Sequence, residues 1–362
     1  MKNNNIYIDQ NAVTILTEVE EGSKDDLCNL LTKMGSDEKG GGIVDFEKIS
    51  TLHFLRWFLI GNEDVPNTKE GDFENDKLPV TLAFTSNYDG DLDAHLKEIL
   101  EVAREGIIKV YKNCKGFPKP AAPSDSEIIT YLKANTKKNQ LFWPAIRGGT
   151  VEQLKGESLL RSAIQGFLDS LVQEEKIECK SPKEIKELIV EFVGKDDSLS
   201  WALTPRAKPS FSWKFKYYGA LVLNLVVFLF PLLILLGICF LLSYIFNKKD
   251  NKNRKDISRS QDFDALLKNE DRIFMNQLTV YGALKKPYWF RRTQLRLGLW
   301  LFSLNGKYRS NKGKLSGMET IHFARWALFN KNRNVMFLSN YDGAWEIYLS
   351  EFIDRSAAAM NL

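Results

Sequence analysis

The chain has 362 residues, which is enough for two domains and the segments that connect them. With a net charge of only +4 and 27% charged residues, it lacks the basic excess of nucleic-acid-binding proteins, so we expect no nucleic-acid partner. The four cysteines are scattered and form no CxxC pair, which argues against a disulfide framework or a zinc site and suits a reducing, cytosolic setting.

The first part of the chain alternates short strand-like and helix-like segments. Apolar alternation indicates strands, and apolar residues at helical spacing indicate helices. In chain order we predict strand 13–19, helix 24–34, strands 49–60 and 79–85, helix 91–112, a short helix at 126–134 and a closing strand at 140–146. This β-α-β-β-α-β order is that of the ferredoxin-like unit.

Two helices and a long apolar run follow the closing strand. Segments 151–173 and 181–193 have helical spacing, and we assign 151–212 as a helical linker. Segment 217–246 holds no charged residue, and its length predicts a membrane segment. Basic residues flank it on both sides and Pro231 lies at its middle, which favours a re-entrant hairpin with both ends cytoplasmic over a spanning helix.

The last part of the chain repeats the first. We predict strand 276–281, helix 287–304, strands 320–329 and 334–339 joined by a turn at 330–333, and helix 344–360. The helix 287–304 is basic and aromatic, and Trp289 and Trp300 make it a candidate for contact with lipid. A fourth strand is lacking, so the unit 275–362 is expected to be incomplete at its C-terminus.

Two pairs of matching heptapeptides show that these two parts are copies. TLHFLRW at 51–57 matches TIHFARW at 320–326, and FTSNYDG at 84–90 matches FLSNYDG at 337–343. Two matched blocks in one order indicate an internal duplication. We therefore expect an α+β fold in which two ferredoxin-like βαββαβ repeats, 12–146 and 275–362, form one intramolecular α+β barrel with the membrane segment between them.

This duplicated pattern resembles the dimeric α+β barrel superfamily, in which two ferredoxin-like units pack sheet against sheet. The resemblance implies such a fold, and members of the superfamily include small monooxygenases, chlorite dismutases, haem-degrading enzymes and dye-decolorising peroxidases. Haem is therefore a candidate cofactor. The Gly-x-x-Asp-Gly signature of the peroxidases lacks its first glycine in both copies here, so the resemblance assigns no haem ligand.

The repeated blocks supply the candidate catalytic residues, all of them polar and present in both copies: His53, His322, Arg56, Arg325, Asp89 and Asp342. Strict alternation along a strand places each histidine on the face of Trp57 or Trp326 and each arginine on the opposite face. The histidines are either bases or ligands in a pocket lined by the tryptophans, or buried groups bonded to neighbours. The arginines are expected to pair with the aspartates, as a pocket or as salt bridges beside a helix cap.

Three functions from different classes remain open at this point. The first is a membrane-anchored protein that binds or oxidises a lipophilic small molecule, with its repeats on the cytoplasmic side. The second is a haem-dependent peroxidase-like enzyme. The third is a non-enzymatic membrane-associated scaffold. The predicted partners are a lipid bilayer and an apolar small molecule, and no metal site is predicted.

Overall fold

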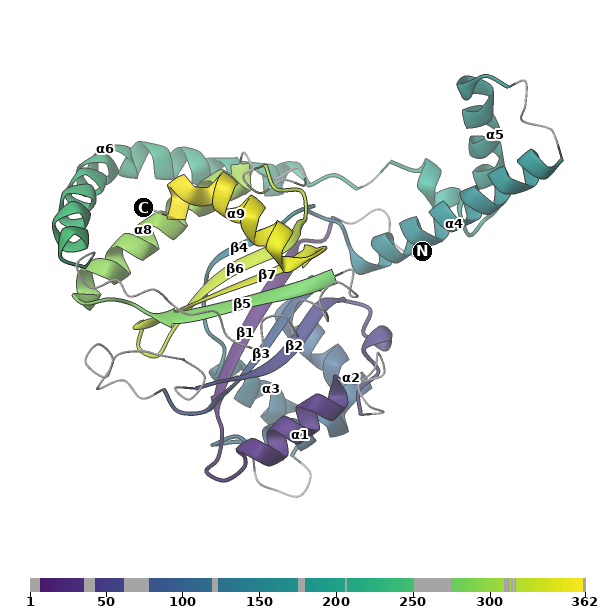
Figure 1. Ribbon diagram of the computed structural model, residues 1–362. Coiled ribbons are helices and arrows are strands. Elements are labelled where there is room, and N and C mark those ends of the chain that lie inside the picture. Colours follow the sequence, from purple (N-terminus) through teal and green to yellow (C-terminus); the bar gives the residue numbers. More distant parts are fainter. Residues whose placement is uncertain are drawn as a thin grey trace.

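The computed structural model has a mixed α+β fold with two separate β-sheets (Figure 1). It describes residues 7–35, 43–61, 78–118, 123–174, 180–205, 207–250, 275–308, 313, 315 and 317–360. Residues 62–77, which join the strands predicted at 49–60 and 79–85, and residues 251–274, which hold most of the basic residues that directly follow the apolar run, lie outside the described residues.

The first repeat forms a three-stranded antiparallel sheet of order β1-β3-β2, covered by helices on one face. Apolar side chains of β1 and β3 pack against α1, α2 and α3 in one buried core. The elements are β1 (Gln10–Glu18), α1 (Lys24–Met34), the short helix η2 (Phe46–Lys48), β2 (Leu52–Ile60), β3 (Thr81–Asp89), α2 (Leu92–Tyr111) and α3 (Asp125–Ala134).

The second repeat contributes three strands to a four-stranded sheet of order β4-β6-β7-β5. Its hairpin turns through Asn330, Lys331 and Asn332, which all have positive φ, a conformation that Asn tolerates better than most residues. The elements are β5 (Met275–Ala283), α8 (Tyr288–Tyr308), β6 (Ile321–Phe329), β7 (Asn334–Asp342) and α9 (Trp345–Met360).

Strand β4 (Asn139–Pro144) belongs to the first repeat in sequence but to the second sheet in space. We expected this segment to close the first ferredoxin-like unit, and that prediction is wrong. It pairs antiparallel with β6, and α8 covers it: a Cβ added to Gly306 would lie 2.9 Å from Trp143. The glycine leaves room for the indole, so α8 provides the apolar cover that β4 needs.

The two sheets pack face to face. Leu16, Ile60 and Ala83 of the first sheet form a buried cluster with Phe329 and Met336 of the second. The expected closed α+β barrel is nevertheless not what forms. In the described part of the chain, only the isolated bridge between Ile15 on β1 and Thr136 joins the first sheet to the segment that leads into β4. Among the described strands β2 and β5 remain outer strands of two separate sheets, so the pairing does not close into a barrel.

Two linker helices project from the sheets as an arm (Figure 1). They are α4 (Val151–Gln173) and α5 (Pro182–Lys195). Thr150 caps α4, and Ser181 with Glu184 forms a capping box on α5, so both helices begin where their sequence signals lie. Phe167 and Phe192 stack at 4.3 Å and hold the two helices together.

The apolar run lies in one helix, α6 (Phe211–Asp250), which continues through Pro231. The predicted hairpin bent at Pro231 is therefore wrong. An internal proline removes one backbone hydrogen bond and bends a helix without reversing it. Over the residues that the structure describes, none of the helices has the combination of length and hydropathy needed to cross a membrane, so the predicted membrane segment at 217–246, hairpin or transmembrane helix, is also wrong.

Helix α6 is tied to α8 at both ends and arches between these ties (Figure 1). The hydroxyl of Tyr308 donates to the carbonyl of Tyr217 at 2.8 Å, and the rings of Phe246 and Phe290 lie 5.3 Å apart. A straight helix rises about 44 Å from Tyr217 to Phe246 but only about 27 Å from Phe290 to Tyr308. The longer helix must bow away from the shorter one, and eleven described apolar side chains between 222 and 245 are exposed.

Candidate functional site

Each repeated histidine contacts the repeated aspartate of its own copy. His53 Nε2 lies 2.8 Å from Asp89 Oδ1, and His322 Nε2 lies 2.8 Å from Asp342 Oδ1. The first pair is sealed, with side chains 3% and 8% exposed, whereas both side chains of the second pair are 33% exposed. The contact in the second pair is at ion-pair distance but lacks the alignment of a hydrogen bond.

The predicted pairing of arginine with aspartate is wrong. Arg56 donates from Nη1 to the carbonyl of Gln277 at 3.0 Å and to the hydroxyl of Thr279 at 3.4 Å, both on β5. Arg325 donates to the carbonyls of Val13 and Ser86 at 2.7 and 3.0 Å. Both arginines therefore cross to the other repeat and join the two sheets.

Arg325 is a buried cation with backbone carbonyls as its acceptors. It is 2% exposed, and burial lowers the pKa of its guanidinium to about 9, with a smaller opposing effect from Tyr88. The group stays charged at neutral pH, and its hydrogen bonds offset part of the cost of burial. This arrangement supports a structural role for Arg325.

Nor is the predicted shared face of histidine and tryptophan found. The strand registers shift between Leu52 and Phe54 and between Ile321 and Phe323, so a β-bulge interrupts the alternation next to each histidine. His53 then faces the other repeat, where its ring lies 5.2 Å from that of Phe323. The bulge is why alternation from the sequence misplaces this side chain.

The two tryptophans lie on the helix-covered faces of their sheets. Trp57 packs against Phe84 at 5.1 Å, and Trp326 packs against Phe302 and Phe337 at 5.5 and 4.4 Å. Both belong to helix-side cores, so they do not line a space with the histidines. Beside the histidines, the layer between the sheets is filled by aromatic rings, with Phe54 and Phe323 5.8 Å apart.

Asn87 and Asn340 meet at the centre of the layer between the sheets. They occupy equivalent positions in the two copies, and Asn87 Nδ2 donates to Asn340 Oδ1 at 2.7 Å. Both residues are almost fully buried. The contact of a residue with its own repeat equivalent marks an approximate two-fold axis between the copies.

A buried polar network surrounds His95, which lies outside the repeated blocks and is not among the candidate residues predicted from the sequence. The ring is fully buried, stacks on Tyr88 at 4.3 Å and lies within hydrogen-bonding distance of Ser86 and Thr51. Burial lowers the pKa of His95 to about 4, which keeps the ring neutral at neutral pH. The position of His95 among the apolar residues of the amphipathic helix α2 is the sequence signal that could have indicated its burial.

Asp89 is also not the helix cap that the sequence suggested. Asp91 caps α2 by accepting from the amides of Asp93 and Ala94. The second oxygen of Asp89 accepts from the amide of Val151 at 2.7 Å, which ties the start of α4 to the end of β3. The first copy of the His–Asp pair is thus fully engaged within the fold.

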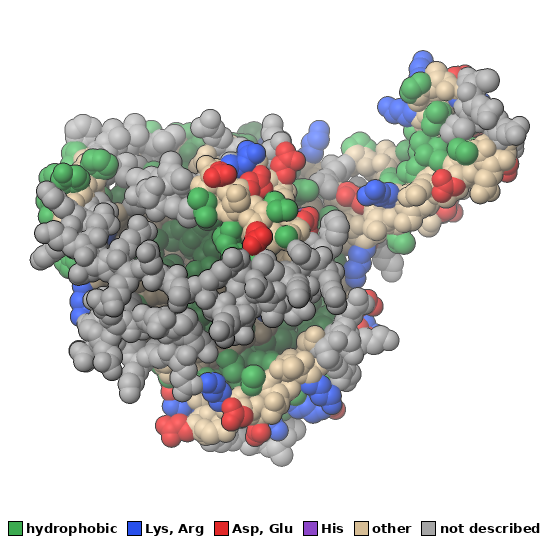
Figure 2. Space-filling view, viewed as in Figure 1, with side chains coloured by type: hydrophobic (Ala, Val, Ile, Leu, Met, Phe, Trp, Pro, Cys, Tyr) green, Lys and Arg blue, Asp and Glu red, His purple; other side chains and the backbone are tan. Residues whose placement is uncertain are grey.

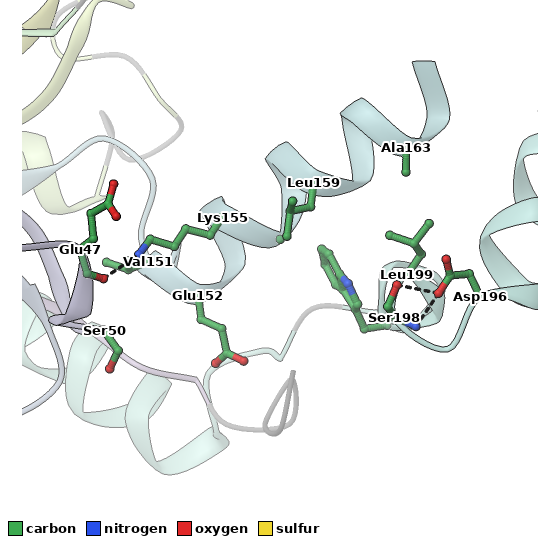
Figure 3. Close-up of a pocket in the computed structure, with 12 residues that line it drawn as sticks. Glu47, Ser50, Val151, Glu152, Lys155, Leu159, Ala163, Asp196, Ser198 and Leu199 are labelled. Carbon is green, nitrogen blue, oxygen red and sulfur yellow. Dashed lines mark hydrogen bonds between the residues drawn. The ribbon is translucent and has the colours of Figure 1, made fainter. Parts of the chain in front are cut away.

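A groove of about 600 Å³ lies where the arm meets the first repeat (Figure 3). Lys155 points from α4 across it and donates to the carbonyl of Glu47 at 3.3 Å. On the other side, Asp196 accepts from the amide and hydroxyl of Ser198. The lining mixes carboxylates, one lysine and apolar side chains.

The described residues hold no cluster of three or more His, Cys, Asp and Glu side chains that could bind a metal ion. His53 is also poorly placed to ligate haem, because it is 3% exposed and its Nε2 faces Asp89. His322 is the more accessible of the two.

Comparison with known proteins adds no assignment. No protein-family model matches the chain, and neither a curated protein nor a solved structure does.

Proposed function

We propose that the chain is a non-enzymatic scaffold that docks on a lipid surface through the arch of α6. The observation that carries this proposal is the exposure of apolar side chains along the arch. Val226 is 77% exposed, Phe240 is 74% exposed and Leu223 is 62% exposed. Figure 2 shows hydrophobic side chains on the outer curve of α6, at the upper left.

The size of this surface argues that it has an occupant. Eleven apolar residues between 222 and 245 are 38–77% exposed. Covering them would contribute on the order of 5–10 kcal/mol before the cost of ordering and association is subtracted. A continuous exposed apolar surface of this kind marks an interaction site in a folded protein.

The composition around the arch favours lipid as that occupant. Segment 217–246 carries no charge, and the exposed residues Lys214 and Lys216 lie just before it. Trp289, 62% exposed, and Arg296, also exposed, lie on the neighbouring helix α8. Aromatic rings suit the headgroup boundary, and basic side chains suit anionic headgroups, as at the cytoplasmic face of a bilayer.

Vesicle sedimentation tests the proposal. Purified protein is mixed with vesicles of phosphatidylcholine alone or with one quarter phosphatidylglycerol, and we expect binding that is tighter to the anionic vesicles. Val226→Asp and Phe240→Asp together should weaken binding at least about tenfold, because each charge must be dehydrated at the lipid boundary.

The matched control is Leu159→Asp, where the side chain is 69% exposed but belongs to α4 of the arm rather than to α6. It should bind vesicles like the unaltered protein. Absence of vesicle binding, or equal loss in the control, contradicts the proposal. Self-association without vesicle binding would mean that the arch binds a second copy of the chain, and it would also contradict the lipid-docking proposal.

A second candidate function rests on the exposure of the His322–Asp342 pair. A carboxylate beside a partly exposed histidine is an arrangement that can orient a base, so the binding or oxidation of an apolar small molecule remains a proposal for this copy. An absorbance spectrum of gently purified protein tests the haem-dependent version. A Soret band that disappears in His322→Phe would support it, and a featureless spectrum would remove it.

A further inference from the structure

The two sheets meet along two seams, which are the lines where an outer strand of one sheet lies beside an outer strand of the other. At the first seam, β4 fills the gap between β1 and β6. The segment just before β4 hydrogen-bonds to β1. The amide of Leu16 donates to the carbonyl of Asn135, and the amide of Lys137 donates to the carbonyl of Thr14. It then pairs with β6, and the amide of Ala145 donates to His322.

The second seam lies between β2 and β5, which are the repeat equivalents of β6 and β1. Side chains bridge it: Arg56 donates to the carbonyl of Gln277, and the hydroxyl of Tyr281 donates to that of Gly61 at 3.4 Å. No described strand pairs with the outer edge of β2 or of β5. The second seam therefore lacks, within the described residues, the strand that fills the first.

Because the second seam lacks this strand among the described residues, side chains beside it should be more exposed than their repeat equivalents beside the first seam, and they are. Arg325 and Ile15, next to the filled seam, are 2% and 0% exposed. Their equivalents next to the second seam are more open: Arg56 is half-buried, and Val280 is 52% exposed. In the first repeat, Ile15 shares its core with Ile128 and Leu132 of α3, the helix that leads into β4.

We infer that the seam between β2 and β5 is a docking site for an extended β-strand of a partner polypeptide, with the chemistry of β4. The approximate two-fold relation between the repeats defines how it binds. The strand pairs antiparallel with β2, as β4 pairs with β6, and its backbone amides and carbonyls bond to the outer edge of β2.

The approximate two-fold symmetry between the repeats also predicts which side chains the partner strand carries. On β4, Phe142 stacks on Phe323 at 6.0 Å between the sheets, and Trp143 is buried under a helix. The equivalent of Phe323 on β2 is Phe54. The partner strand therefore carries an aromatic residue that faces Phe54 and a large apolar residue next to it in sequence, which faces the opposite side.

A labelled peptide with the sequence of residues 135–146 is the probe. We expect saturable binding to the full chain and at least about tenfold weaker binding of a peptide with Ser in place of Phe142, because one buried aromatic contact is lost. Two further peptides, N-methylated at alternate residues, separate strand pairing from side-chain binding. Only one of them should bind, because only alternate amides face β2. Equal affinities of these two would overturn the inference.

Photo-crosslinking locates the bound peptide. A benzophenone group at its centre should label residues 52–60 or 275–283. Labelling confined to 10–18 or 321–329 would mean that the peptide displaces β4 at the first seam, and it would overturn the inference. Hydrogen exchange of the free protein gives the last check: the outer-edge amides of β2 should exchange rapidly and become protected when the peptide binds. Protection already present in the free protein would show that the chain itself covers this edge, which also overturns the inference.

Discussion

The pairing of β4 with the second repeat makes a prediction about one glycine. Gly306 on α8 faces Trp143 on β4, and a Cβ there would lie 2.9 Å from Trp143 Cδ1, closer than real Cβ contacts allow. The indole is 2% exposed and cannot move aside without disturbing the core around it. Overpacking of this kind costs about 1–3 kcal/mol, while alanine gains about 1 kcal/mol in helix propensity over glycine. We therefore expect Gly306→Ala to lower the free energy of unfolding by up to about 2 kcal/mol.

The same helix offers a matched control. Gly298 lies inside α8, and a Cβ added there meets nothing within 4 Å. Gly298→Ala should therefore raise the free energy of unfolding by about 0.5–1 kcal/mol, because only the propensity changes. Urea titration monitored by circular dichroism measures both variants. Shifts of the same sign in the two variants would contradict the packing of β4 under α8.

A double-mutant cycle makes the test specific for β4. Trp143→Leu removes the ring that the new methyl group would meet, so Gly306→Ala should cost at least about 1 kcal/mol less in that background. Trp143 belongs to the first repeat in sequence and Gly306 to the second. A coupling energy near zero would show that β4 closes its own repeat, as the sequence suggested, and would refute the exchanged strand.

Three further outcomes follow from the different burial of the three histidines. The folded-state pKa of His95 is lowered to about 4 from 6.5, so the unfolded chain binds more protons between these values and stability falls as the pH drops from 6.5 towards 4, by up to about 3 kcal/mol. His95→Gln should remove most of this pH dependence in urea titrations at pH 7, 6 and 5, and an unchanged slope would contradict the burial of a neutral ring. His53→Phe should cost about 1–3 kcal/mol because Asp89 loses a buried partner, whereas His322→Phe should cost less than about 1 kcal/mol; equal losses would mean that the two pairs are buried alike.

Most helices and strands were predictable because their signals are local. The helices at 24–34 and 151–173 begin and end where the sequence predicts, and the second of them has the capping residue Thr150 directly before it. The asparagine-rich turn at 330–333 also joins two strands as expected. Each of these features depends on residues within one turn of the chain.

The partner of β4 could not be predicted in this way. Alternation indicates which side chains share a face, but it does not say which strand lies next to the edge. The segment bonds to β1 at its start and pairs with β6 afterwards, and the contact that favours β6 joins Trp143 to a helix more than 150 residues later in the chain. The prediction of the sheet face on which His53 and His322 lie was wrong for a related reason. A β-bulge adds one residue to the alternation next to each histidine, and no local sequence signal marks it here.

The duplication led us to expect the same role for both copies of the His–Asp motif, but the two copies have different surroundings. The amide of Val151, at the start of α4, donates to Asp89 and completes the first His–Asp pair. Among the described residues, no backbone amide of a helix is recorded as a donor to Asp342 as the amide of Val151 is to Asp89. The second pair is therefore left one-third exposed, with an aspartate oxygen near the ring but not aligned with it. The two copies of one motif thus form a buried pair that supports the fold and a second pair whose side chains are one-third exposed. If this motif carries any chemistry, we expect it at His322 rather than at His53, because only the second pair is within reach of a ligand from solvent.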